Sequence, residues 1–142
     1  MISVKNFIVC DDIREERRNK TSLMGIYGDR VNISTKLGDT NAVSLPLSFF
    51  ISLSCTELPK NSLNFVAEFT YSKPVAKAEG DILFHNRGVT NLALSRIPFS
   101  FTNGGLLNVS LKIFESGKEV LSHSESIKIN ISRMGIDAEI PN

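Results

Sequence analysis

The side chains that could do chemistry are concentrated near the N-terminus. Asp11, Asp12, Glu15 and Glu16 stand within six residues, and Asp29 follows further along the chain. Carboxylates at this density are the ligands that a hard cation such as Ca²⁺ takes. A metal site at one end of the fold is therefore the first hypothesis to weigh.

Two observations argue against that metal site. The segment 11–20 also holds four cations, so its charges cancel and favour a solvated, ion-paired connector: Arg14, Arg17, Arg18 and Lys20. Strand-like segments at 2–11 and 20–28 would place Asp11 and Asp29 roughly 30 Å apart, at about 3.3 Å per residue. We therefore expect no bound metal.

The residues usual in catalysis are few and scattered. His85 and His123 each stand alone in their segments, and Cys10 and Cys55 lie in separate apolar runs. Neither cysteine has a second ligand two or three residues away, as a zinc site needs. There is no Gly-x-Ser-x-Gly motif and no glycine-rich phosphate loop. We expect no enzyme activity and no cofactor, and we expect both cysteines to be reduced and buried.

The apolar pattern indicates strands throughout. From Leu63 to Tyr71, apolar and polar residues alternate with period two, which is typical of a strand with one face on a core. The segments 109–113 and 127–131 behave in the same way. Phe7–Cys10 and Leu23–Tyr27 are apolar on both faces instead, so we expect them in interior strands.

Turn residues separate these runs and set the fold class. Asn103-Gly104-Gly105 and Ser116-Gly117 predict tight turns, and 73–77 reads as an exposed loop. Many short strands in 142 residues predict one domain, 1–142, that is all-β. We expect a two-layer antiparallel β-sandwich of about seven to nine strands. A closed or partly open β-barrel is the alternative.

Charge and targeting signals limit the partners. Lys plus Arg number 16 and Asp plus Glu number 15, so the net charge is +1 and gives no reason to expect nucleic acid. The N-terminal apolar run, Phe7–Cys10, is too short for a secretory signal, and no segment approaches the roughly 20 apolar residues of a membrane span. We expect a cytoplasmic protein with no membrane partner.

The connector from Asp11 to Lys20 is the candidate binding site. It is longer than a hairpin needs and too polar for the core, and arginine is enriched at interface hot spots. The candidate residues are Asp11, Asp12, Arg14, Glu15, Arg17 and Arg18. The sequence thus favours a small protein-binding module whose partner is another protein. The alternative is a structural or assembly component that associates with itself through its sheet faces.

Two strings in the first thirty residues resemble a known family. Cys10-Asp-Asp-Ile-Arg-Glu-Glu16 and Lys20-Thr-Ser-Leu-Met-Gly-Ile-Tyr27 are similar to motifs of an uncharacterised family of small bacterial and phage proteins. In that family an uncharged, glycine-containing turn precedes the lysine, whereas this chain has Arg17-Arg18-Asn19. The resemblance implies no activity and no functional residue. It is compatible with an inhibitory or defence-related role in a mobile element.

Overall fold

The computed structural model of the protein describes residues 1–36, 42–84 and 88–134. Nine strands account for most of these residues, with a single 3₁₀ turn, η1, at Arg17–Asn19. The strands are β1 (Ile2–Glu15), β2 (Thr21–Ile26), β3 (Arg30–Lys36), β4 (Val43–Cys55), β5 (Leu63–Tyr71), β6 (Lys73–Ile82), β7 (Val89–Phe101), β8 (Gly105–Glu115) and β9 (Lys118–Met134).

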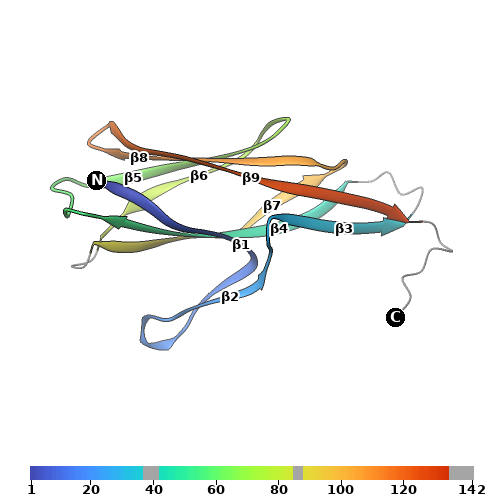
Figure 1. Ribbon diagram of the computed structural model, residues 1–142, viewed down its shortest axis with the longest axis horizontal. Coiled ribbons are helices and arrows are strands. Elements are labelled where there is room, and N and C mark those ends of the chain that lie inside the picture. The colour runs from blue at the N-terminus through green and yellow to red at the C-terminus, as the bar shows by residue number, and fades with distance from the viewer. Residues whose placement is uncertain (37–41, 85–87, 135–142) are drawn as a thin grey trace.

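The strands form two sheets, so the predicted sandwich is confirmed over the barrel. One sheet has the order β2-β1-β4-β7, and the other has the order β3-β9-β8-β5-β6. Figure 1 shows the two sheets as layers, with β5, β6, β8 and β9 above β1, β4 and β7. The pairing is antiparallel except that β3 runs parallel to β9.

The core lies between the layers and follows the period-two pattern. In β5 the buried residues are Leu63, Phe65, Ala67 and Phe69, as their alternation predicts. The rings of Phe49 and Phe69, from opposite sheets, have centroids 5.0 Å apart. Burying side chains of this size contributes roughly 1.5–3 kcal/mol each, which is why the alternating residues fix the faces of both sheets.

The two segments with apolar residues on both faces differ from each other. Phe7–Cys10 lies in β1, which stands between β2 and β4 in the sheet order, but β2 reaches only the end of this segment. Val9 and Cys10 are buried as expected, whereas Phe7 and Ile8 pair with β4 alone and are half-buried, so the expectation is wrong for them. Leu23–Tyr27 was expected to be interior as well, and this is wrong. β2 is an edge strand, and Met24 and Ile26 are 45% and 62% exposed.

Turns were predicted better than strand bounds. Ser116-Gly117 and 102–104 do connect β7, β8 and β9. The segment 73–77 is the first half of edge strand β6 rather than a loop, because an edge strand tolerates proline and lysine. No helix among the residues described is long and apolar enough to cross a membrane.

Both cysteines are free, as expected. Cys10 is fully buried, whereas Cys55 is only partly buried, so the expectation of two buried thiols holds for Cys10 alone. Burial raises the pKa of the Cys10 thiol, and the carboxylate of Asp11 raises it further. This thiol is therefore a structural side chain in the folded protein.

Candidate functional site

β1 changes its neighbour at Cys10, and this change creates a separate hairpin. Up to Cys10 the strand pairs with β4, where Cys10 lies opposite Ser48. From Cys10 to Glu15 it pairs with β2. In Figure 1 this second half of β1 and all of β2 leave the two layers and form an arm below them. We call residues 11–27 the β1–β2 hairpin.

The β1–β2 hairpin lies over the outer face of its own sheet. Along β4 the core residues alternate with Ser48 and Ser52, which face outward and are nevertheless 0% and 8% exposed. Cys10 and Ile13 are also buried, yet they are not part of the core between the sheets. Their burial therefore comes from contacts outside the core between the two sheets. At the tip, Glu15, Asn19 and Thr21 line a cavity together with the start of β7.

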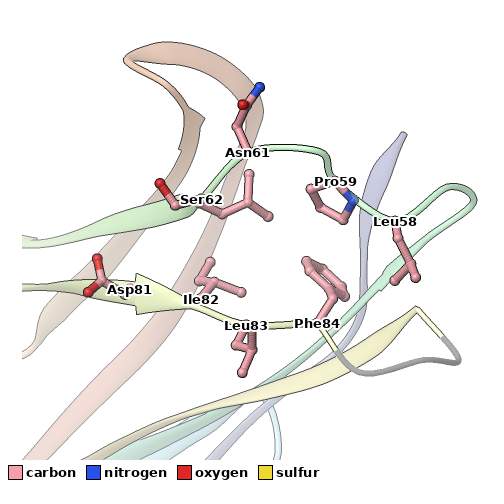
Figure 2. A pocket seen from close by; sticks show the side chains of 9 residues that line it. Leu58, Pro59, Asn61, Ser62, Asp81, Ile82, Leu83 and Phe84 are labelled. Carbon is pink, nitrogen blue, oxygen red and sulfur yellow. The ribbon is translucent and has the colours of Figure 1, made fainter.

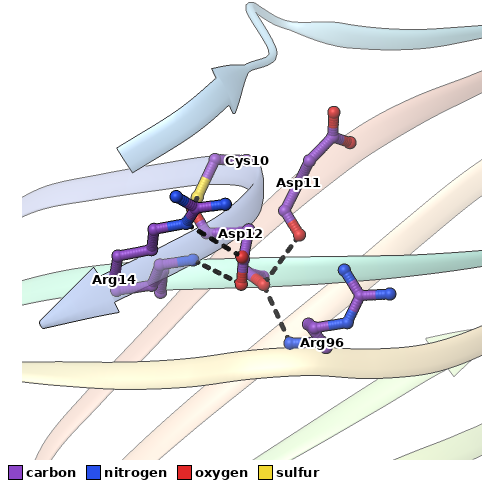
Figure 3. A network of polar contacts seen from close by, with 7 residues as sticks. Cys10, Asp11, Asp12, Arg14 and Arg96 are labelled. Carbon is purple, nitrogen blue, oxygen red and sulfur yellow. Dashed lines mark hydrogen bonds and ion pairs between the residues drawn. The ribbon is translucent and has the colours of Figure 1, made fainter. Parts of the chain in front are cut away.

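Ser48 fastens the base of the hairpin to the sheet. Its hydroxyl donates to the carbonyl oxygen of Asp11 at 3.1 Å and accepts from the backbone N–H of Arg96 at 2.8 Å. Figure 3 shows this contact below Asp11, with Arg96 approaching from β7. The register of β4 with β7 shifts here, between Leu47 and Phe49. Ser48 therefore satisfies two backbone groups at the point where both neighbouring strands depart from regular pairing.

Asp11, Gly25 and Tyr27 form a second contact at the base. The phenolic hydroxyl of Tyr27 donates to Oδ1 of Asp11 at 2.5 Å. Gly25 has a positive φ of 64°, and a Cβ there would lie 2.4 Å from Oδ2 of Asp11. Glycine is thus required both by the backbone and by the close approach of the carboxylate. Two causes raise the pKa of Tyr27 to about 12. Its partial burial is the larger, and its hydrogen bond to Asp11 is the next.

Asp12 organises the strand that leads to the tip. Its Oδ1 accepts from the backbone N–H of Ile13 at 3.0 Å, and its Oδ2 lies 3.7 Å from Nε of Arg14. Figure 3 shows the carboxylate between these two groups. Arg14 is well exposed, so this ion pair contributes little to stability.

The tip carries two exposed arginines, Arg17 and Arg18. Neither lies within 4.0 Å of a carboxylate oxygen in the described part of the chain. Arg18 has φ 62° and ψ 38°, and Asn19 also has a positive φ. The left-handed conformation costs a residue other than glycine roughly 1 kcal/mol, although asparagine tolerates it better. The tip therefore holds Arg18 in a strained backbone, and no ion pair among the described residues compensates for the strain.

The structure corrects the candidate loop in two respects. Asp11, Asp12, Arg14 and Glu15 are residues of β1, and only Arg17 and Arg18 lie in the turn, which spans 16–20. The expected 30 Å between Asp11 and Asp29 is also wrong. Because Asp12 pairs with Met24 and Tyr27 binds Asp11, Asp29 follows only two residues after a side chain that contacts Asp11.

The other chemical candidates stay apart. Among the residues described, no group of three or more His, Cys, Asp and Glu side chains could hold a metal ion. His123 is partly buried, with Nε2 3.1 Å from Oε1 of Glu125 and its ring beside Phe7. The position of His85 lies outside the described residues.

A separate cavity of about 420 Å³ opens at one end of the sandwich. Figure 2 shows Leu58, Pro59 and Phe84 around it, with Ile82 and Leu83 at the end of β6. β6 ends at Ile82, so Leu83 lies outside the sheet and is 76% exposed. The lining is mainly apolar and brings together no pair of groups suited to catalysis.

The sequence indicated a charged connector here rather than a hairpin, and it did not indicate the residues that shape the hairpin. Ser48 reads as an ordinary strand serine, and nothing in the sequence distinguishes it. Gly25 did carry a signal, because an isolated glycine in a strand pattern marks an irregular backbone. No protein-family model matches the chain, and no curated protein is similar to it.

Proposed function

We propose that this chain is a small protein-binding module that docks another protein through the tip of the β1–β2 hairpin. One observation carries the proposal: Arg18 is exposed, is held in a left-handed backbone and has no ion pair with any residue that the structure describes. Folding gains nothing from an arginine in this position, since glycine would fit without strain. Strain of this kind concentrates at functional sites.

The surroundings of Arg18 suit protein recognition. Arg17 stands beside it, also without an ion pair in the described structure, whereas the exposed apolar side chains Met24 and Ile26 lie toward the base of the hairpin, opposite Asp12 and Cys10. Arginine is enriched at interface hot spots. The partner would present carboxylates, because the guanidinium groups bind carboxylates in pairs of hydrogen bonds.

The proposal places the module in the cytoplasm, without a cofactor and without catalysis. The resemblance of its N-terminal strings to bacterial and phage proteins supports an inhibitory or defence-related role in a mobile element. Self-association is the second candidate, and the exposed edge of β2 favours it.

The experiment compares two triple variants. A partner is captured with the parent protein, purified, and titrated against Arg14→Ser/Arg17→Ser/Arg18→Ser. We expect affinity to fall at least about thirtyfold, equivalent to roughly 2 kcal/mol at a hot spot. The melting temperature should move by only a few degrees.

The matched control replaces three exposed lysines away from the hairpin. Lys73→Ser/Lys77→Ser/Lys128→Ser removes the same charge from β6 and β9 and should leave affinity unchanged. Equal affinity of the arginine variant and the parent would show that the partner docks elsewhere.

A further inference from the structure

β9 continues past the beginning of β8 and leaves a notch in the five-stranded sheet. β8 begins at Gly105, opposite Ile129, whereas β9 runs on beside β3 to Met134. In Figure 1 the ends of β9 and β3 lie together beyond the beginning of β8. A cavity of about 580 Å³ lies here, and residues of β3, β8 and β9 line it. We call this cavity the β9 notch.

Polar side chains line the β9 notch from the outer face of the sheet. Ile129 is buried in the core, so Lys128 and Asn130 on either side of it face outward. Asn32 lies opposite Asn130, and its Oδ1 accepts from Nδ2 of Asn130 at 2.9 Å. The amide nitrogen of Asn32 and the hydroxyl of Ser132 add further donors. An ammonium group, amides and a hydroxyl therefore line one cavity.

Gly104 opens the cavity to the backbone of β9. A Cβ at this position would lie 2.9 Å from the carbonyl oxygen of Ile129 and 3.7 Å from the backbone nitrogen of Ile131. Backbone groups of alternate residues point to the same side of an antiparallel strand, so the N–H of Ile131 points toward the side of β8. Because the pairing of β8 with β9 ends at Ile129, this N–H faces the notch. Glycine at 104 thus leaves room beside a backbone donor.

The cations beside the notch outnumber the carboxylates. Lys128 lies directly opposite Arg30, and like charges in facing positions destabilise a sheet. Oδ1 of Asp29 accepts from Nε of Arg30 at 3.3 Å; this hydrogen bond, the charge of Arg30 and, more weakly, that of Lys128 hold the pKa of Asp29 below its usual value. In the described part of the chain, no carboxylate oxygen lies within 4.0 Å of Lys128, and no Asp or Glu lines the notch. Two cations therefore share one carboxylate.

We propose that the β9 notch binds a phosphate group, either as the free ion or on a small phosphate ester. The open edge of a sheet forms a concavity that suits an anion. Lysine binds phosphate as a point charge, whereas a planar carboxylate is matched better by the fork of an arginine, and the cation that lines the notch is Lys128. A tetrahedral group also presents oxygens in several directions, which suits donors on both the outer face and the backbone edge.

The inference goes beyond the proposed function, because the notch belongs to the five-stranded sheet and the β1–β2 hairpin to the other sheet. Its test needs no protein partner, so its outcome is independent of the titration at the hairpin tip. The isotope-labelled full chain is titrated with sodium phosphate at constant ionic strength, and amide NMR shifts are followed. We expect saturable shifts at the backbone amides of Gly104 and Ile131 and at the side-chain amide of Asn32.

Phenyl phosphate distinguishes the two sources of the phosphate group. Tighter binding than that of inorganic phosphate assigns the notch to an ester, and equal or weaker binding assigns it to the free ion. Sodium acetate is the third ligand in the series. Acetate that binds as tightly as phosphate overturns the assignment of a phosphate group.

Two charge variants test the residues that carry the proposal. Lys128→Gln should weaken phosphate binding about tenfold or more, the loss expected for a hydrogen bond to a charged group. Asp29→Asn should tighten binding about twofold or more, because it removes the carboxylate that the two cations share. Lys112→Gln is the matched control, since it removes an exposed lysine from β8 on the outer face of the same sheet, and it should leave binding unchanged. Melting temperatures check that the variants are folded.

The proposal is overturned if phosphate produces no saturable shift at the notch, or if sodium chloride at equal ionic strength produces the same shifts. It is overturned equally by a Lys128→Gln variant that binds as tightly as the parent, or by equal losses in Lys128→Gln and Lys112→Gln. An Asp29→Asn variant that binds no more tightly than the parent contradicts the charge argument on which the proposal rests.

Discussion

Tyr27 and Asp11, sixteen residues apart in sequence, meet at the base of the β1–β2 hairpin, where the Tyr27 hydroxyl donates to the Asp11 carboxylate. On the same residue, the backbone carbonyl of Asp11 accepts from Ser48. Asp11 thus joins β2 to β1 through its side chain and β1 to β4 through its backbone. The orientation of the arginines at the tip depends on these contacts.

Gly25→Ala should destabilise the protein by about 1–3 kcal/mol. The added Cβ meets the Asp11 carboxylate and the residue must keep a positive φ. Gly28→Ala is the matched control, since a Cβ there meets nothing within 4 Å and the backbone is not left-handed, so urea denaturation should show almost no loss. If the clash is responsible, Asp11→Ala/Gly25→Ala will cost less than the sum of the single changes. If the cost of the double variant equals the sum of the two single costs, the close contact between Gly25 and the Asp11 side chain is contradicted.

Tyr27 should ionise well above Tyr71, the only other tyrosine. Burial raises the pKa of Tyr71 as well, whereas the pKa of Tyr27 reaches about 12 because Asp11 adds to burial. A raised pKa means that the folded state favours the protonated hydroxyl. Its contribution to stability is therefore complete below pH 10 and is lost as pH rises from about 10 to 12.

Absorbance at 295 nm follows this titration directly. Asp11→Asn should lower the pKa of Tyr27 without returning it to 10, because burial remains the largest cause. Tyr27→Phe identifies the transition by removing it. Two tyrosines that titrate together near pH 10 would contradict both the burial of Tyr27 and its contact with Asp11.

Ser48→Ala should cost about 1–3 kcal/mol, since it leaves the Arg96 N–H and the Asp11 carbonyl without their shared partner. Ser52→Ala is the comparison, because Ser52 bonds only to the side chain of Asn91, which can turn toward water. We expect the smaller loss there by denaturant unfolding. Equal losses would indicate that Ser48 does not anchor the hairpin.

Arg18→Gly should stabilise the protein by about 1 kcal/mol, a rise in melting temperature of about 2–4 °C, by relieving the left-handed backbone. Arg17→Gly lacks this benefit, since Arg17 is not left-handed, and should be neutral or destabilising. If the proposed function is correct, the stabilised Arg18→Gly variant also binds its partner less tightly than the parent protein does. A variant with unchanged or lower stability would remove the strain argument.

The fold class could be predicted because the alternation of apolar and polar residues in the sequence follows which side chains are buried. Each alternating run has its apolar residues in the core, as Leu63, Phe65 and Phe69 show. The hairpin could not be predicted in the same way. Only Ile13 of its first strand is buried, so Asp12-Ile13-Arg14 reads as a charged loop even though it is regular strand.

The candidate site was found in part for the same reason. Counting charges located the arginines, which are exposed as expected, but not the contacts that hold them. The apolar run Leu23–Tyr27 suggested an interior strand because sequence cannot separate a covered face from an exposed edge. The pairing of β1 with β4 ends at Cys10, opposite Ser48, which is 38 residues away in sequence, and long-range pairing of this kind leaves no local signal.

The most direct test of the central claim is a hydrogen-exchange footprint of the partner complex. Amide exchange is measured residue by residue in the free protein and in the complex with the captured, purified partner. The account predicts new protection within residues 11–27, strongest around Arg17 and Arg18, while the outer face of β5, β8 and β9 is unchanged. Protection confined to that outer face, with the hairpin exchanging as in the free protein, would contradict it.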